Sequence, residues 1–344
     1  MPNVNVTGLA AYAAERDTTL RGLPYLKLLE VLAAAGIGLS RNETKQTITE
    51  MHRKGGVARP YTSADVDLDA KISPELMKLL EIPIDPVLCY FESFDDITNY
   101  DKPELAVHYG KKIDNKTYKH PWEQEIRNVV GITIPEDSLL GVYHAVRKND
   151  GTTSLDTYNG LFKQRDNLIA GGYMSAAKGN YIATPALTDA AKPTNAWDVA
   201  VAFLKALPLK MKMGTFNFKM SLDAYLKIQE AWEAKFPYSA GSATIPLIEE
   251  KLRNAALCQN MQLKPTMLVG MGDYLEASTE DCMEFSFAPD GSPFLRIRDY
   301  DRNPNKIQFW AQYKCATRIR TYSPNKFVTN DKSNSMPANL FGDY

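Results

Sequence analysis

The sequence predicts an α+β protein, and three observations lead to that fold class. Apolar residues recur at helical spacing in several capped segments. Shorter stretches alternate between apolar and polar side chains, as half-buried strands do. From Ile307 this alternation continues for thirteen or more residues, whereas strands average about five to six. A chain of 344 residues with these patterns is long for one core and suggests two or three lobes on a shared framework.

The long alternating segment begins at Ile307 and is the most informative element. Its apolar face comprises Ile307, Phe309, Ala311, Tyr313, Cys315, Thr317 and Ile319. Its polar face comprises Gln308, Trp310, Gln312, Lys314, Ala316, Arg318 and Arg320. At about 3.3 Å per residue, the strand would be roughly 45 Å long. Such a length suits an elongated framework better than a compact enzyme core.

The charge balance limits the function classes. The chain has 40 Lys and Arg against 41 Asp and Glu, a formal net charge of −1. Proteins that grip nucleic acid through phosphates carry a basic excess, which is absent here. The chain could therefore enclose DNA but is not expected to read it. A net charge near zero also leaves little repulsion to oppose self-association.

No membrane or secretory segment is expected. The first apolar run, Leu23 to Leu39, is interrupted by Lys27 and Glu30 and is too short and too charged to span a bilayer. The cysteines are far apart, with no pair spaced for zinc and no disulfide framework. They are Cys89, Cys258, Cys282 and Cys315. We expect reduced thiols in a product of the cytoplasm.

The first 85 residues are expected to be helical and to lie outside the main core. One short helix starts at Pro24 and stops at Gly36. Ser40 and Glu43 form a possible capping box for a second, mostly polar helix that ends at Gly55 and Gly56. A third is expected to open at 73–75. Such helices bury little surface alone and would need a neighbour.

A change of character follows at residue 86. An apolar segment, Val87 to Phe94, leads into a polar stretch from Asn99 to His120, which is typical of an extended hydrophilic hairpin. A β-branched apolar return runs from Ile126 to Ile134. The hairpin is either a long surface loop or a projecting arm over an adjacent molecule. Loops of this length are usually functional.

The second half contains a series of capped helices and short strands. The expected helices begin at Pro135, Asn195 and Ser221, with another helix within 238–265. The expected strands are 214–220, 266–269, 283–287, 294–298 and 326–329, with a turn at 289–291. The glycine-rich stretch 171–180 lacks the spacing of a phosphate or dinucleotide loop.

No catalytic, cofactor-binding or metal-binding residue is predicted, and the chain is not expected to be an enzyme. The four histidines have no metal-ligand spacing and are His52, His108, His120 and His144. No Gly-x-Ser-x-Gly motif is present, and neighbouring carboxylates such as Glu249 and Glu250 diverge in a helix. Four arginines on polar strand faces, Arg296, Arg298, Arg318 and Arg320, are either partners in ion pairs between subunits or exposed cross-strand charges.

The order of these elements resembles the carboxy-terminal half of major capsid proteins with the Hong Kong 97-like fold. The quoted segments are TFNFKMSLDAYLKIQEAW, TMLVGMGDYLEAS and IQFWAQYKCATRIRTYSPNKFVTND. Tailed bacteriophages and encapsulin shells share this fold. The resemblance implies an axial domain, a spine helix near Glu136 to Asn149, an extended loop, and a closing strand in a peripheral domain.

The resemblance implies a division of the chain along its length. The expected parts are an N-terminal arm at 1–85, the extended loop at 86–132, a peripheral domain with the spine helix at 133–193, the axial domain at 194–300, return strands at 301–330 and a C-terminal tail at 331–344.

The implied function is a major capsid protein that forms hexamers and pentamers of an icosahedral shell around double-stranded DNA. Its implied partners are copies of itself, with scaffold, portal and other virion proteins, no cofactor and no membrane. Its location would be the virion, after assembly in the host cytoplasm. An encapsulin compartment, a tail or adaptor subunit and a soluble enzyme remain as alternatives.

Overall fold

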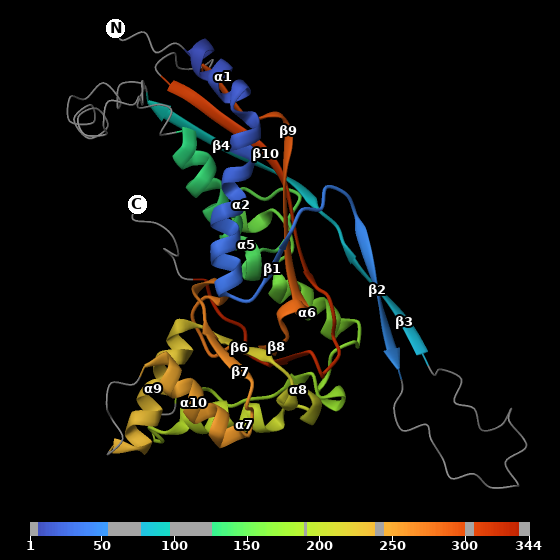
Figure 1. Cartoon of the computed structure of the whole chain (residues 1–344), viewed down its shortest axis with the longest axis vertical. Helices are drawn as coiled ribbons and strands as arrows, with labels where there is room; N and C mark the ends of the chain where they lie inside the picture. The colour runs from blue at the N-terminus through green and yellow to red at the C-terminus, as the bar shows by residue number, and fades with distance from the viewer. Residues whose placement is uncertain are drawn as a thin grey trace, which may run out of the picture.

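Two packed lobes and a projecting hairpin make up the described part of the chain (Figure 1). The computed structural model describes residues 6–53, 77–96, 126–188, 191–237, 244–299 and 306–336. Each lobe has its own cluster of buried apolar side chains. The molecule is elongated, with the first lobe at the top of Figure 1 and the second lobe at the bottom.

The first lobe is built on a four-stranded sheet in the order β1-β9-β10-β4. Its strands are β1 Gly38–Ser40, β4 Val87–Asp96, β9 Met283–Asp299 and β10 Lys306–Ile319. The central strand β10 pairs antiparallel with both β4 and β9, and β1 joins the far side of β9 in parallel. The predicted long strand is confirmed, with 14 residues.

Strand β9 differs from the prediction of two strands divided by a turn at 289–291. It is one strand of 17 residues with an irregularity in its middle. Gln312 of β10 pairs with Asp290, but the preceding Ala311 pairs with Leu295. The residues between bulge out, and Gly291 supplies the positive φ of 78° that the bulge requires. The bulge lets one strand follow β10 along its whole length.

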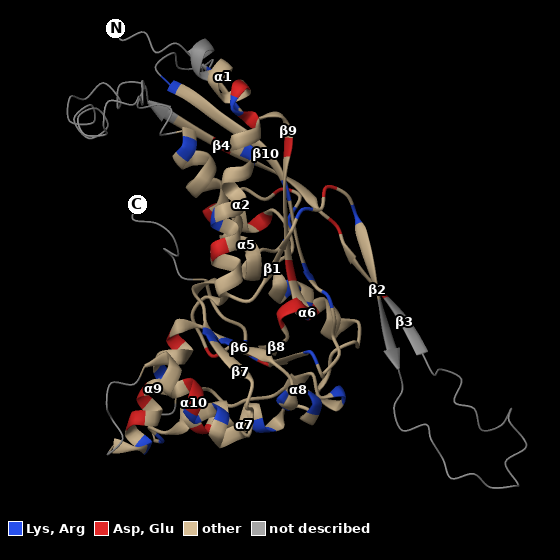
Figure 2. Ribbon diagram, in the orientation of Figure 1, with Lys and Arg blue, Asp and Glu red and all other residues tan. Residues whose placement is uncertain are grey.

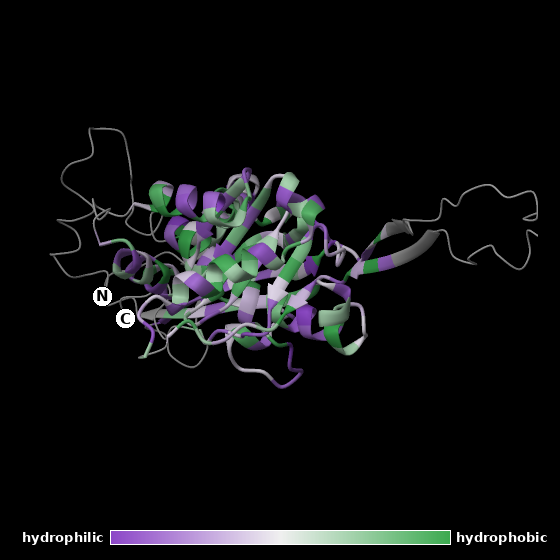
Figure 3. Ribbon diagram, turned by 90° about the horizontal axis from the view of Figure 1, so that it is seen from below, coloured by the Kyte–Doolittle hydropathy of each residue, from purple (hydrophilic) through white to green (hydrophobic). Residues whose placement is uncertain are grey.

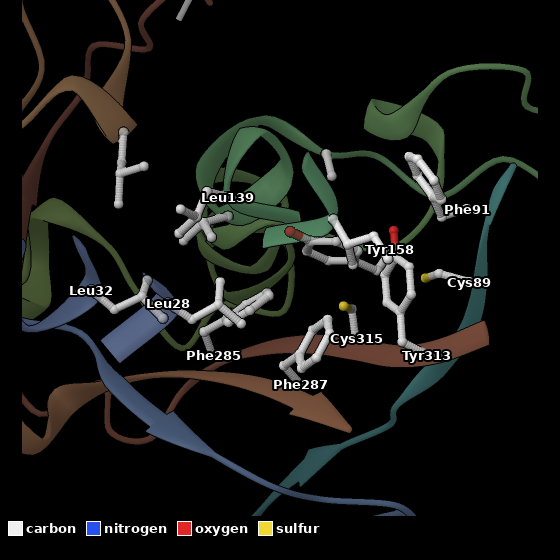
Figure 4. Close-up of a cluster of buried hydrophobic side chains, with 14 of the residues drawn as sticks. Leu28, Leu32, Cys89, Phe91, Leu139, Tyr158, Phe285, Phe287, Tyr313 and Cys315 are labelled. Atoms are coloured by element: carbon white, nitrogen blue, oxygen red, sulfur yellow. The ribbon is translucent and has the colours of Figure 1, made fainter. Parts of the chain in front are cut away.

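Helices from the N-terminus and the middle of the chain pack on one face of this sheet (Figure 4). They are α1 Val6–Glu15, α2 Asp17–Ala34, α5 Ile134–His144 and α6 Leu161–Ala170. Leu28 and Leu32 of α2 are fully buried with Phe285 and Phe287 of β9. The prediction that the first 85 residues lie outside the main core is therefore wrong. Pro24 lies inside α2, not at its start.

The spine helix begins earlier than predicted. Residues 126–144 are helical, although 126–134 was predicted as an extended apolar return. Pro135 has no N–H to donate to the preceding turn, and the helix widens to a π-helix, Val129–Thr133, just before it. The helix ends at His144, five residues before the predicted stop at Asn149.

The second lobe packs four helices against a five-stranded sheet in the order β5-β11-β8-β6-β7. The strands are β5 Tyr181–Ile182, β6 Phe216–Met220, β7 Met261–Pro265, β8 Leu275–Ser278 and β11 Phe327–Asn330. The helices are α7 Asn195–Ala206, α8 Leu209–Met213, α9 Leu222–Lys235 and α10 Ile245–Ala256.

Most second-lobe predictions are confirmed because they rest on local signals. The Ser221 side chain accepts a hydrogen bond from the Ala224 N–H, the predicted helix cap of α9. The strand predicted at 266–269 is wrong, since Met267–Val269 form a 3₁₀ turn and the strand is β7 just before it.

A two-stranded sheet, β2 Gln46–Arg53 and β3 Met77–Ile84, replaces the predicted second helix. The run Gln-Thr-Ile-Thr at its start has the β-branched alternation of a strand, which overrides the capping-box signal. The third predicted helix, at 73–75, and the polar hairpin from Asn99 to His120 lie outside the described residues.

The two ends of the predicted loop region 86–132 do not form a loop. Its first part is β4, an edge strand of the main sheet, and its last part belongs to the spine helix. None of the helices in the described ranges is both long and apolar enough to cross a bilayer.

Candidate assembly surfaces

No histidine was predicted to be a catalytic or metal-binding residue, and the structure shows where His52 and His144 lie. Within the described ranges, no three His, Cys, Asp or Glu side chains come close enough to hold a metal. His144 packs edge-on against Phe162 at 5.2 Å between ring centroids, and burial lowers its pKa. His52 is a residue of β2, while His108 and His120 lie outside the described residues.

The hairpin of β2 and β3 is the most prominent feature that leaves the body of the molecule. Seen from the side and from below, it extends away from both lobes (Figures 1 and 3). Its strands pair antiparallel from Gln46 with Ile84 to Arg53 with Met77. Ile82 and Ile84 are buried at its base. A projecting two-stranded ribbon is at best marginally stable alone, which suits a segment that packs on another molecule.

Two buried charges hold the base of this hairpin to the long strands. Arg318 of β10 and Glu284 of β9 are each 3% exposed at their side chains. Arg318 Nε donates to the Glu284 carboxylate at 3.0 Å, and its Nη1 reaches the Ile82 carbonyl oxygen of β3 at 3.4 Å. Arg320 Nε donates to the same carboxylate at 2.9 Å. The sequence left two alternatives for Arg318 and Arg320, ion pairs between subunits or exposed cross-strand charges. Arg318 is instead buried in an ion pair within the chain, and the partly exposed Arg320 pairs with the same carboxylate.

The Glu284 carboxylate is strongly biased to its charged form. Burial alone would raise its pKa, but hydrogen bonds from Arg320, Ser40 and Arg318 outweigh burial and lower the pKa to about 2. The Asn42 amide also donates to this carboxylate, at 3.3 Å. The cluster joins β1, β9, β10 and β3 at one point.

The sheet of the first lobe has an open face, on the side away from the helices. Along β4, Cys89 and Phe91 point into the core, so Leu88, Tyr90 and Phe94 point to this open face. Their exposures are 52%, 66% and 42%. Three large apolar side chains on an edge strand form a patch of the kind found at protein interfaces.

The polar side chains of the open face are ordered by one another. The Arg296 guanidinium lies over the Trp310 ring, 4.9 Å from its centroid. Arg298 donates to Gln308, and Gln308 donates to Glu92, a relay across β9, β10 and β4. These contacts hold Arg296 and Arg298 in place and leave them exposed beside the apolar patch. Both predicted alternatives, ion pairs between subunits and exposed cross-strand charges, stay open for these two arginines.

A second buried ion pair lies where the two lobes meet. Lys219 of β6 and Glu276 of β8 are both 0% exposed, with Nζ and Oε1 3.3 Å apart. Lys219 Nζ also donates to the Gly36 carbonyl oxygen at 3.0 Å, just beyond α2. Tyr274 and Ser278 donate to the two oxygens of Glu276 at 2.9 and 2.8 Å. The pair ties the second lobe to the segment that follows α2 in the first lobe.

Sequence alternation alone does not find this pair. It predicts that Phe216, Phe218 and Met220 share a buried face and leaves Lys219 on the other, solvated face. All five residues of β6 are buried, because the first lobe covers the other face of the strand. The one available signal is a lysine between Phe218 and Met220 in a short apolar strand.

No protein-family model matches the chain, and no curated protein matches it in sequence. Solved structures do match in fold. A chain of the satellite phage P4 procapsid that includes the size determination (Sid) protein superposes with a TM-score of 0.50 at 10% identity, over 90% of this chain and 99% of that one. A chain from the capsid of the native GTA particle gives 0.51 at 12% identity, over 88% and 96%.

This chain has the Hong Kong 97-like capsid fold. The match spans both lobes, since it covers about nine-tenths of the sequence. The predicted fold class is thereby confirmed, including the long paired strands and the helix beside them. A third match is a chain from the capsid of the empty GTA particle, which superposes with a TM-score of 0.50 at 13% identity, over 88% of this chain and 89% of that one.

Proposed function

We propose that the chain is the major capsid protein of a tailed bacteriophage or prophage and assembles into a closed icosahedral shell. The observation that carries this proposal is the whole-length match to procapsid and capsid chains, which covers 99% and 96% of two of them. If this chain shared only one domain with capsid proteins, the match would cover only part of those capsid chains. The role is structural, without a catalytic step.

The surfaces of the subunit support assembly. The hairpin of β2 and β3 extends from the body (Figure 1), and the open face of the sheet presents an apolar patch on an edge strand. Interfaces of obligate assemblies bury on the order of 2,000–5,000 Å². In the proposed shell, the hairpin lies on a neighbouring subunit and the open face is covered by another.

We assign the two lobes to the two domains of the capsid fold. The second lobe is the axial domain that surrounds the centre of each ring of five or six. Its core cluster runs from Leu187 to Leu263 and also contains Leu275, Ala277 and Val328. The first lobe is the peripheral domain that joins rings. Strand β9 packs in the core of the first lobe, so we assign it to the peripheral domain, and we assign β11, which belongs to the sheet of the second lobe, to the axial domain. The hairpin at 46–84 is the proposed extended loop.

The charge balance supports enclosure of DNA without specific binding. A net charge of −1 gives the subunit no general affinity for phosphates. Scaffold, portal and other virion proteins would be its partners. The shell would assemble in the cytoplasm of the host and become part of the virion.

Expression of the chain alone, followed by negative-stain electron microscopy and sedimentation, tests the proposal. Closed spherical shells or rings of five and six subunits are the expected products. Tubes would support a tail subunit instead, and dispersed single subunits at all concentrations would contradict a shell function.

A further inference from the structure

The second lobe has a groove on its outer side that is not part of the assembly surfaces described above. It lies between α7, α9 and α10, at the lower end of the molecule in Figure 1, and encloses about 650 Å³. That volume falls within the range of about 300–1,000 Å³ typical of binding pockets. Its existence does not follow from the capsid fold, because the side chains that form it belong to this sequence.

The wall of the groove is aromatic and rigid. Trp197 of α7 and Trp232 of α9 are 4% and 1% exposed, so their rings are fixed by the core. Phe236, at the end of α9, lies edge-on to Trp197 with 6.3 Å between ring centroids and is 40% exposed. A fixed aromatic wall with an open side binds a bulky apolar group with little loss of conformational entropy.

The rim of the groove is basic, and the three helices that border it carry Lys or Arg residues, drawn in blue in Figure 2. Lys205, Lys235 and Lys251 line it, one from each of the three helices, and Asp198 is the one carboxylate among the described lining residues. Asp198 is already paired with Lys235, at 2.5 Å. Among the described residues, the carboxylate recorded near Lys251 is that of Glu250, at 4.0 Å, and both side chains are exposed. Two ammonium groups therefore border an apolar floor without a close counter-charge from the lining.

We propose that this groove binds an acidic segment of another protein, with one bulky apolar side chain packed on Phe236 beside the two tryptophans and its carboxylates on Lys205 and Lys251. Charge complementarity selects this partner over a basic peptide, which would meet like charge at the rim. A second copy of the chain is the other occupant that the experiment must separate.

Fluorescence anisotropy with labelled peptides tests the proposal on the purified full-length chain. The probe contains one phenylalanine flanked by three glutamates on each side. Two control peptides replace the phenylalanine by alanine or the glutamates by lysines. At an ionic strength of about 0.15 M, where exposed charges are largely screened beyond about 8 Å, the probe should bind about tenfold more tightly than either control. Equal binding of all three peptides would overturn the proposal.

Chain variants locate the site. Lys205→Glu with Lys251→Glu should weaken probe binding about tenfold or more, and the matched pair Lys192→Glu with Lys210→Glu should not. All four lysines belong to the same lobe, and the control pair is exposed and outside the groove. Equal losses in the two double variants would show attraction by net charge alone.

A third variant fills the groove without changing charge. Ala202 is an exposed residue of α7 that lines the groove, so Ala202→Trp should block the probe while circular dichroism stays unchanged. If the variants fail to fold, the affinities of the three peptides for the unaltered chain still test the proposal. Self-association that is lost in Ala202→Trp, with no binding of the probe, would assign the groove to a second copy and overturn the proposal. Shell formation is scored separately, so its failure does not affect this result.

Discussion

Arg318 and Glu284 form a buried ion pair that lies directly under the base of the projecting hairpin. The same arginine reaches the carbonyl oxygen of Ile82, so one side chain joins β9, β10 and β3. The direction in which the hairpin leaves the body is therefore set by a charge cluster rather than by apolar packing alone. Neutral substitution of either partner would leave the other charge buried without compensation.

Glu284 predicts how the stability of the subunit depends on pH. Its pKa in the folded protein is about 2, below its ordinary value of 4.5. The folded state therefore binds this proton less tightly than the unfolded state, and the stabilisation is complete above pH 4.5 and lost as the pH falls toward 2. The difference of about 2.5 pKa values corresponds to roughly 3 kcal/mol.

Urea unfolding of the wild type and of Glu284→Gln between pH 2 and pH 6 measures this effect. The variant should have a smaller free energy of unfolding at pH 6. Below pH 4.5, its free energy of unfolding should fall less steeply with decreasing pH than that of the wild type. The exposed Glu250→Gln is the control and should keep the wild-type profile. A Glu284→Gln profile that runs parallel to the wild type would contradict the assignment.

The Lys219–Glu276 pair predicts a strong dependence on both partners. Lys219→Met preserves side-chain length but leaves the fully buried carboxylate of Glu276 without its cation. The expected loss is about 3–5 kcal/mol, measured as a lower urea midpoint. Adding Glu276→Gln to Lys219→Met should restore part of the loss, because no charge then remains buried.

A matched control lies in the same lobe. Lys227 pairs with Asp223 and Asp273 at 2.8 and 3.1 Å, but its side chain is 29% exposed. Lys227→Met should cost less than about 1 kcal/mol, as expected of a solvated pair. Similar losses for Lys219→Met and Lys227→Met would show that burial of the junction pair has no energetic consequence.

The sequence predicted those elements whose signals are local. The cap of α9 at Ser221 and the alternation of β10 depend on residues within a few positions of one another. Strand β2 has a local signal in the β-branched run at 46–49, but the capping pair Ser40 and Glu43 is a local signal that favours a helix. These two signals conflict, and the pairing with β3, which begins 24 residues after β2 ends, favours the strand.

The candidate surfaces were less predictable than the fold. Arg318 lies on a strand face that alternation marks as polar, and only the approach of β3 and Ser40 makes that face an interior. Lys219 is hidden for the same reason, because the first lobe covers β6 from outside its own domain. Contacts between segments that are far apart in the sequence decide the burial of both.

Two helical glycines predict opposite effects of the same substitution. At Gly22 of α2, an added Cβ would meet nothing within 4 Å. Gly22→Ala should therefore raise stability by about 0.5–1 kcal/mol, since alanine favours the helix. At Gly141 of α5, an added Cβ would lie 2.6 Å from the buried Tyr158 hydroxyl oxygen. Gly141→Ala should cost about 1–3 kcal/mol through overpacking.

Thermal unfolding of the two variants side by side measures the contrast. Tyr158 donates to the Ser138 carbonyl oxygen at 2.5 Å and cannot move without losing that bond. A stabilised Gly141→Ala would mean that Tyr158 has room to shift, and that the packing of α5 is looser than the structure shows.

The open face predicts a separation of folding from assembly. Tyr90 is 66% exposed and makes no contribution to the core of the first lobe, whereas its neighbours Cys89 and Phe91 do. Tyr90→Asp should therefore leave the melting temperature within a few degrees of the wild type. In the proposed shell the same change places a carboxylate in a desolvated interface without a partner, which costs several kcal/mol at every contact.

Sedimentation and negative-stain microscopy of Tyr90→Asp and Tyr90→Phe distinguish the two roles. Tyr90→Phe keeps the ring and should form shells. Tyr90→Asp should remain as small, folded particles, because the penalty recurs in each copy and a closed shell needs every copy in place. Normal shells from Tyr90→Asp would show that Leu88, Tyr90 and Phe94 stay uncovered after assembly. The interface would then have to be sought on the hairpin and the second lobe alone.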